Sequence, residues 1–136
     1  MKKLYVPLSL VFILILAFSC SGEMSYDLTG SWSVENEMYS ESHGFIQNTF
    51  EEGFVITEQK GHVFKGYKIY VNALDKEEYT ENFSGTVSVY GDILIAEHED
   101  GILSGVVENR NSIILQYAEN GDIPKVQYIK LNRIEQ

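Results

Sequence analysis

The residues of this chain that could perform acid–base or metal chemistry are few and widely spaced. The three histidines, His43, His62 and His98, form no His-x-x-x-His or Cys/His pattern of the kind that holds zinc. A histidine lies between acidic residues only at positions 97–100, Glu-His-Glu-Asp. Alternation along a strand would put Glu97 and His98 on opposite faces, so we interpret this segment as a solvated turn. The sequence therefore predicts no metal site.

Motifs for catalysis are also absent from the sequence. It contains no Gly-x-Ser-x-Gly nucleophile motif, no P-loop and no dinucleotide-binding Gly-x-Gly-x-x-Gly. The acidic segment 75–78, Asp-Lys-Glu-Glu, is typical of a solvated loop. No group of residues can be named that would form a catalytic site. The sequence therefore favours a protein that is not an enzyme and that uses no cofactor.

Cys20 is the only cysteine of the chain, so an internal disulfide is excluded. It follows two lysines and the apolar run 4–18, the layout of a secretory signal peptide, and this run is shorter than the roughly 20 residues of a membrane-spanning helix. The segment Ala17-Phe18-Ser19-Cys20 resembles the lipobox of bacterial lipoproteins, although that motif prefers Leu, Val or Ile at the position of Ala17. The resemblance implies cleavage before Cys20 and lipid on its thiol. The alternative is an uncleaved membrane anchor with an incidental cysteine.

The chain then divides into a signal peptide at 1–19, a lipidated cysteine with a short tether at 20–28, and one domain at 29–136. Removal of the signal peptide would leave 117 residues and change the net charge from −10 to −12, because Lys2 and Lys3 are lost. This acidity disfavours nucleic-acid binding, which needs a basic surface. We expect the protein in the cell envelope, at the outer membrane or cell surface, held to the membrane by lipid on Cys20.

The domain shows the period-two alternation of β-strands and no convincing amphipathic helix. The clearest alternation runs over 83–89, with Phe83, Val87 and Val89 on one face. Turn residues such as Lys60-Gly61 and Gly91-Asp92 separate the predicted strands. Short turns between successive strands predict antiparallel neighbours. The predicted strands are 30–39, 50–58, 62–71, 83–89, 92–98, 102–108, 113–118 and 125–134.

A weak internal repeat predicts that the sheet closes on itself. An aromatic residue or leucine precedes glycine by two positions at Phe64/Gly66, Phe83/Gly85 and Leu103/Gly105, with separations of 19 and 20 residues. This spacing corresponds to one hairpin. Glycine inside a strand relieves crowding where a sheet coils sharply. We therefore predict an all-β, eight-stranded antiparallel up-and-down (meander) barrel, and the alternative is an open sheet or a sandwich.

The two ends of the domain carry a family resemblance. Gly30-Ser31-Trp32 on the first strand and Arg133 on the last strand resemble the signature of the calycin superfamily, which includes lipocalins, fatty-acid-binding proteins and avidins. The resemblance implies that Arg133 packs across Trp32 at the closed end of the barrel. Segments 28–32 and 61–66 are similar to avidins, but the chain lacks the further tryptophans that clasp biotin. The lipocalin-like and META-like envelope lipoproteins are the preferred resemblance.

Strand parity predicts which side chains would face the lumen of such a barrel. The similarity to avidins implies that Phe64 and Gly66 face inward, and parity then turns Lys68 and Tyr70 inward as well. The same parity turns Val87 and Val89 inward on the strand from Phe83, and Gln127 inward on the last strand. The predicted ligand-binding residues are therefore Lys68, Tyr70 and Gln127. Lys68 could pair with a ligand carboxylate, which would indicate a fatty or other organic acid. The alternative is that Lys68 extends to the rim while Tyr70 only packs.

Two functions follow from this prediction. The first is a membrane-anchored lipoprotein with a lipocalin-like barrel that binds a small apolar or amphipathic ligand. The alternative is a structural or protein-interaction module of the envelope, such as an inhibitor or assembly accessory, with a filled barrel. A lumen packed with large apolar side chains and without polar groups would favour the alternative.

Overall fold

The structure of the protein is a computed structural model that describes residues 26–47, 52–71, 76–98, 101–119 and 124–135. The predicted signal peptide, Cys20 and most of the tether lie outside these residues. Within the described residues no helix is long and apolar enough to cross a membrane. The strands are β1 (Gly30–Ser40), β2 (Gly44–Gln47), β3 (Glu52–Lys60), β4 (Val63–Val71), β5 (Glu78–Val87), β6 (Asp92–Glu97), β7 (Ile102–Asn109), β8 (Ser112–Glu119) and β9 (Lys125–Arg133).

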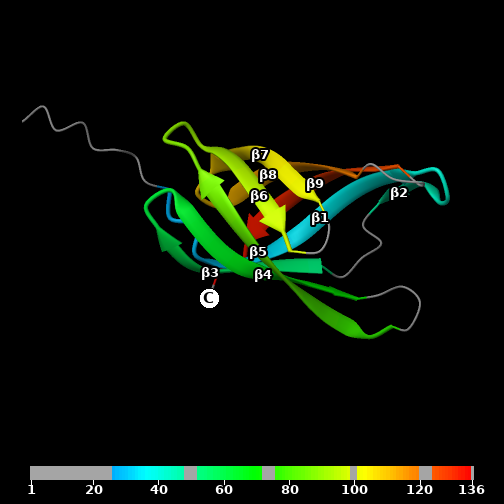
Figure 1. Cartoon of the computed structure of the whole chain (residues 1–136), viewed down its shortest axis with the longest axis horizontal. Helices are drawn as coiled ribbons and strands as arrows, with labels where there is room; N and C mark the ends of the chain where they lie inside the picture. The colour runs from blue at the N-terminus through cyan, green and yellow to red at the C-terminus, as the bar shows by residue number, and fades with distance from the viewer. Residues whose placement is uncertain (1–25, 48–51, 72–75, 99–100, 120–123, 136) are drawn as a thin grey trace, which may run out of the picture.

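The strands form a closed antiparallel barrel of meander topology (Figure 1). β3 to β9 follow one another in the sheet, and β1 pairs with both β3 and β9. The β1–β9 ladder runs from Trp32 opposite Arg133 to Ser40 opposite Lys125 and closes the barrel. The short β2 pairs with the second half of β1, beyond the part that pairs with β3. The barrel proper therefore has eight strands, β1 and β3 to β9, which confirms the predicted all-β, eight-stranded antiparallel meander barrel.

Two differences from the predicted strands have local causes. β2 is not predicted by the sequence, because four residues that follow a left-handed turn at Gly44 (φ +71°) give too short a pattern to recognise. β5 begins at Glu78, five residues earlier than expected, because a polar and exposed stretch pairs with the end of β4. β5 also ends at Val87, where the chain turns toward Gly91. The predicted inward orientation of Val89 is therefore wrong, and its side chain is 37% exposed.

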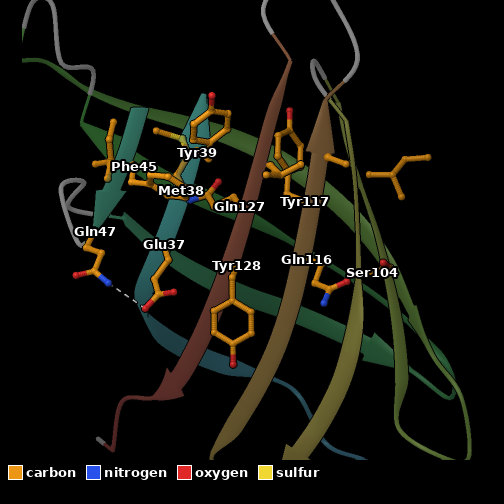
Figure 2. Close-up of a pocket in the computed structure, with 14 residues that line it drawn as sticks. Glu37, Met38, Tyr39, Phe45, Gln47, Ser104, Gln116, Tyr117, Gln127 and Tyr128 are labelled. Atoms are coloured by element: carbon orange, nitrogen blue, oxygen red, sulfur yellow. Dashed lines mark hydrogen bonds between the residues drawn. The ribbon is translucent and has the colours of Figure 1, made fainter. Parts of the chain in front are cut away.

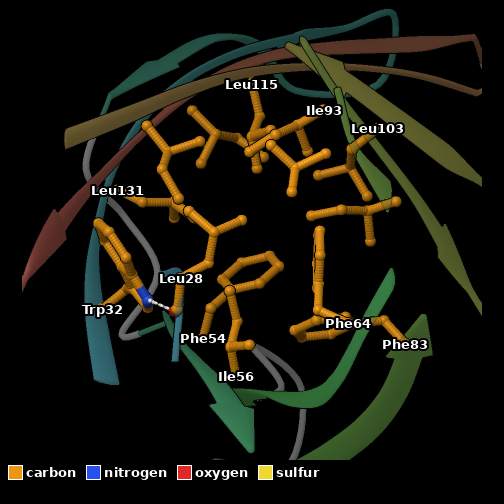
Figure 3. Packing of buried hydrophobic residues seen from close by; sticks show 14 of the residues in the cluster. Leu28, Trp32, Phe54, Ile56, Phe64, Phe83, Ile93, Leu103, Leu115 and Leu131 are labelled. Atoms are coloured by element: carbon orange, nitrogen blue, oxygen red, sulfur yellow. Dashed lines mark hydrogen bonds between the residues drawn. The ribbon is translucent and has the colours of Figure 1, made fainter. Parts of the chain in front are cut away.

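The barrel interior is filled by apolar side chains over most of its length (Figure 3). Inward and outward residues alternate on each strand, as in β5, where Phe83, Gly85 and Val87 are buried and their neighbours are exposed. Leu28 belongs to this core, with 2% exposure, so the barrel begins before the predicted end of the tether. The fully buried side chains include Trp32, Phe54, Phe64, Phe83, Ile95, Leu103, Ile113, Leu115 and Leu131.

Two of the three glycines of the internal repeat make room for aromatic rings on the neighbouring strand, whereas Gly105 lies against the backbone of Ile114. Gly66 of β4 lies opposite Phe83 of β5, and Gly85 of β5 lies opposite Phe64 of β4. A Cβ atom on Gly85 would overlap the ring of Phe64, and one on Gly66 would overlap Phe83 and the carbonyl of Val55. The two rings pack edge to face with centroids 6.4 Å apart. Gly66 and Gly85 thus mark the positions where β4 and β5 each accommodate an aromatic ring from the other strand in the tightly coiled sheet.

Arg133 closes one end of the barrel, which we call the closed end. Its guanidinium carbon lies 4.3 Å from the centroid of the Trp32 ring, as the sequence predicted. The guanidinium also donates hydrogen bonds to the carbonyls of Asp27 (2.7 Å) and Thr29 (2.6 Å), while the Trp32 indole donates to the carbonyl of Leu28 (3.0 Å). Gly30 has φ +128°, and a Cβ there would lie 3.2 Å from Nη1 of Arg133. The three signature residues therefore fasten the start of the domain onto its last strand.

Candidate functional site at the open end of the barrel

The predicted ligand-binding residues Lys68, Tyr70 and Gln127 all line one cavity of about 210 Å³. The cavity lies at the open end of the barrel, where β1 ends, β9 begins and the apolar core stops. Lys68 and Tyr70 follow Phe64 and Gly66 on the inward face of β4, and Gln127 precedes Ile129 on the inward face of β9. The inward orientation that strand parity predicted is the one observed. The cavity is also lined by Glu52, Phe54, Glu81, Glu97, Leu103, Tyr117, Glu119, Lys125 and Ile129.

Lys68 is engaged by carboxylates of two neighbouring strands. Its Nζ atom lies 2.8 Å from Oε1 of Glu97 on β6 and 3.3 Å from Oε2 of Glu81 on β5. The three side chains are buried, with exposures of 17% for Lys68, 10% for Glu81 and 4% for Glu97. The ammonium also lies 5.4 Å from the centroid of Tyr70. Lys68 therefore does not extend to solvent at the rim, and its charge is already balanced within the protein.

Burial and neighbouring charges shift the protonation of this cluster. Burial lowers the pKa of Lys68, but the hydrogen bond from Lys68 to Glu97 and the attraction of Glu97, Glu81 and Glu52 outweigh it and raise that pKa overall. Burial, together with repulsion from Glu81 and Glu52, raises the pKa of Glu97 despite its pairing with Lys68. Burial likewise raises the pKa of Glu52, against the attraction of Lys68 and Lys125 and a hydrogen bond from Asn36. Lys68 is thus positively charged, and Glu97 and Glu52 take up protons more readily than exposed carboxylates do.

A second charged group lies on the opposite wall of the cavity, at the β8–β9 turn. Lys125 and Glu119 are register partners, and Lys125 Nζ lies 3.3 Å from Glu119 Oε2. The Tyr117 hydroxyl donates a hydrogen bond of 3.1 Å to the same carboxylate oxygen, and the Lys125 ammonium lies 5.1 Å from the Tyr117 ring centroid. Both ammonium groups of the cavity are therefore held by carboxylates and by tyrosine rings.

Glu97 corrects the interpretation of segment 97–100. It is the last residue of β6, faces the lumen and pairs with Lys68, so it is not part of a solvated turn. The same alternation that buries Ile93 and Ile95 on β6 turns Glu97 inward. His98 is exposed, and the two acidic residues after it lie outside the described part of the chain. With four carboxylates and two ammonium groups along the cavity, its charge opposes the acidic ligand that Lys68 alone had indicated.

A second hollow, of about 850 Å³, lies on the outer surface beside this cavity (Figure 2). One row of register partners runs across its floor from Phe45 and Tyr39 through Val126 and Ala118 to Ile102, and we call it the apolar row. Phe45 is 90% exposed and packs on Tyr39 with ring centroids 4.9 Å apart. The groove shares Tyr117 and Gln127 with the lumen cavity, so the two hollows border the same stretch of β8 and β9. Sequence analysis did not predict this groove, although outward apolar residues at matching strand ends are visible in the alternation.

None of the three histidines lines the lumen cavity or the outer groove. His43 Nδ1 lies 2.7 Å from the Ser42 hydroxyl, and His62 Nδ1 lies 2.8 Å from the carbonyl of Val87 near the closed end. Over the described residues, no group of three or more His, Cys, Asp or Glu side chains could hold a metal ion. The chemistry that the open end offers is therefore recognition by charge, hydrogen bonds and aromatic faces.

Comparisons with known proteins identify the fold. No family model matches the sequence, and no curated protein matches it. The structure of EF1p2_mFAP2b bound to DFHBI is similar, with a TM-score of 0.54 and 15% identity over 79% of this chain and 94% of that one. The S-type phycobiliprotein lyase CPES from Guillardia theta is similar with a TM-score of 0.56 and 5% identity, over 80% of this chain and 89% of that one. A de novo designed fluorescence-activating β-barrel has a TM-score of 0.50 and 13% identity over 80% of this chain and 94% of the designed one. The TM-scores show a shared barrel architecture, and at such low identities the similarity extends to the fold alone.

Proposed function

We propose that this chain is an envelope lipoprotein, held to the outer membrane or cell surface by lipid on Cys20, whose barrel binds a small amphipathic ligand. The observation that carries the proposal is that a charged lumen cavity and an apolar outer groove border the same stretch of β8 and β9 and share Tyr117 and Gln127. The ligand's polar end occupies the charged lumen cavity, and its apolar part lies on the apolar row. The protein binds this ligand without transforming it.

The filling of the barrel supports an amphipathic ligand over a purely apolar one. Apolar side chains already fill the interior between the closed end, at Trp32, and the cavity, at Leu103. The space that remains is lined by charged groups, and burying them against hydrocarbon would cost several kcal/mol. The polar cavity is also the reason to prefer ligand binding over the alternative of a filled structural module. That EF1p2_mFAP2b was solved with DFHBI supports the capacity of such barrels to hold a small molecule.

Native mass spectrometry of the lipidated protein purified from its own envelope tests ligand binding. We expect an added mass beyond that of the lipid anchor in the unaltered protein. Gln127→Trp should remove it, because the indole would fill the lumen cavity that Gln127 lines. Ser84→Trp is the matched control, since Ser84 is exposed on the outward face of β5. The proposal fails if the unaltered protein carries no added mass, or if the folded Gln127→Trp variant keeps it.

Detergent phase partition together with metabolic labelling by a palmitate analogue tests the anchor. The mature protein should incorporate the label and enter the detergent phase. Cys20→Ala should do neither, because the acceptor thiol is lost. A Cys20→Ala protein that is processed normally and remains in the membrane fraction would contradict lipid anchoring. That result would leave the proposal of a ligand site unaffected.

A further inference from the structure

The charges of the lumen cavity indicate the chemical class of its ligand, and this inference rests on the proposed function. We propose that the polar end of the ligand is an organic cation, an ammonium group that binds beside Glu52 of β3. Glu52 begins its strand at the open end, lines the cavity, and stands opposite Tyr70 in the β3–β4 register.

Glu52 is the carboxylate of the cavity that forms no salt bridge with a described lysine or arginine. Lys68 is occupied by Glu97 and Glu81, and Lys125 by Glu119. Among the described residues, no ammonium or guanidinium group lies within 4.0 Å of the Glu52 carboxylate. Its one polar contact given by the structure is a long hydrogen bond of 3.5 Å donated by Nδ2 of Asn36 on β1. The Glu52 carboxylate is therefore a negatively charged group that a cationic ligand could bind in this cavity.

The groups that face Glu52 explain why a cation would bind there. The charged side chains that share its cavity are Lys68 on β4, Glu81 on β5, Glu97 on β6, Glu119 on β8 and Lys125 on β9. Together with Glu52 they comprise four carboxylates and two ammonium groups, so the net charge of the cavity is negative. A carboxylate ligand would therefore add repulsion, and an ammonium ligand would reduce it. Burial raises the pKa of Glu52, which means that its ionised form lacks a sufficient partner. A bound ammonium supplies that partner, and the gain is large because the carboxylate is already mostly out of water.

The cavity suits an ammonium group better than a metal ion. Its described residues provide no group of three side chains that could coordinate a metal. Its volume of about 210 Å³ equals about seven water molecules, enough for a head group and a few methylenes. Tyr70 and Tyr117 already face the ammonium groups of Lys68 and Lys125 in the same cavity, at 5.4 Å and 5.1 Å. Aromatic rings in this arrangement favour cations.

Three probes with one skeleton and different head groups test the inference: 4-phenylbutylamine, 4-phenylbutanol and 4-phenylbutyrate. Binding is measured by calorimetry on the lipidated protein in phosphatidylcholine nanodiscs, with empty nanodiscs as the blank. We expect the amine to bind at least about tenfold more tightly than the alcohol, and the acid to bind most weakly. Glu52→Gln should bring the amine to the affinity of the alcohol and leave the alcohol unchanged. Glu35→Gln, which removes one exposed carboxylate from the outer face of β1, is the matched control and should change neither.

The pH dependence gives a second, independent readout. Protonation of Glu52 removes the charge that attracts the ammonium, so the affinity of the amine should fall as the pH is lowered, while that of the alcohol stays constant. Equal affinities for amine and acid, or equal effects of Glu52→Gln and Glu35→Gln, would overturn the inference. If all three probes bind equally and Gln127→Trp abolishes binding, the ligand site stands and only the ammonium assignment fails. If no probe binds and the protein carries no ligand from its envelope, the proposed function fails as well.

Discussion

Replacement of Lys68 by methionine removes one ammonium group from the open-end cavity and keeps a side chain of similar length. Glu97 and Glu81 then lose their common partner, although their side chains are only 4% and 10% exposed. Breaking a buried pair from one side costs about 3–5 kcal/mol, because an uncompensated charge is left behind. Lys68 itself is 17% exposed, so some water can replace it, and we expect the lower value, a loss of about 3 kcal/mol at pH 7.

The loss should depend on pH in a defined direction. In the variant, burial without a cation raises the pKa of Glu97 further above its ordinary value of 4.5. A raised carboxyl pKa in the folded state destabilises it at high pH, and this penalty disappears as the pH falls through the raised value. The difference between the two proteins should therefore be largest at pH 7 and shrink toward 4.5.

Urea unfolding followed by the fluorescence of Trp32, the only tryptophan, measures this difference. A second variant, Lys68→Met with Glu97→Gln, should regain much of the stability at pH 7. It removes one of the two buried carboxylate charges that Lys68 balances in the unaltered protein. A loss below about 1 kcal/mol at pH 7, or a loss that is the same at both pH values, would refute the account of the cluster as a buried and mutually dependent ion pair.

The remaining predictions concern the core, the coiled sheet and Glu52, each measured by urea unfolding. Trp32→Ala should cost about 3–5 kcal/mol, because a large side chain with 1% exposure is removed from the closed end; a loss below about 1 kcal/mol would contradict its role. Gly85→Ala should cost about 1–3 kcal/mol, since its Cβ would overlap the ring of Phe64, whereas Gly53→Ala, with its nearest neighbour 3.7 Å away, should cost little. Glu52→Gln should raise the stability at pH 7, and the gain should vanish as the pH falls to the ordinary pKa of 4.5, because burial penalises only the ionised carboxyl.

The barrel could be predicted from the sequence because its signals are local. Inward and outward residues alternate along each strand, and glycines with positive φ, such as Gly61, Gly91 and Gly101, mark turns between strands. The spacing of glycine and aromatic residues predicts closure, and the structure shows why: Gly66 and Gly85 each accommodate a ring from the neighbouring strand. The contact of Trp32 and Arg133 followed from a family resemblance, not from spacing.

The charged cavity could be predicted only in part, because its members come from strands far apart in the chain. Parity places Lys68 in the lumen, but its partner Glu97 lies 29 residues further on. The charge of Lys68 taken alone indicated an acidic ligand, and the carboxylates around it reverse that indication. Parity on β6 could have turned Glu97 inward, but the acidic residues after it suggested a turn. Glu52 could not be recognised as unpaired, since that depends on which cations the other carboxylates hold.

The most direct test of the account is to locate a bound cation on the protein by nuclear magnetic resonance. Backbone amide shifts of the lipidated protein in nanodiscs are mapped while 4-phenylbutylamine is added. The account predicts changes centred on Glu52, Tyr117 and Gln127, with the closed end around Trp32 and Gly91 unaffected. Changes confined to the closed end, or spread evenly over the outer surface with none at these three residues, would contradict a ligand site at the open end of the barrel.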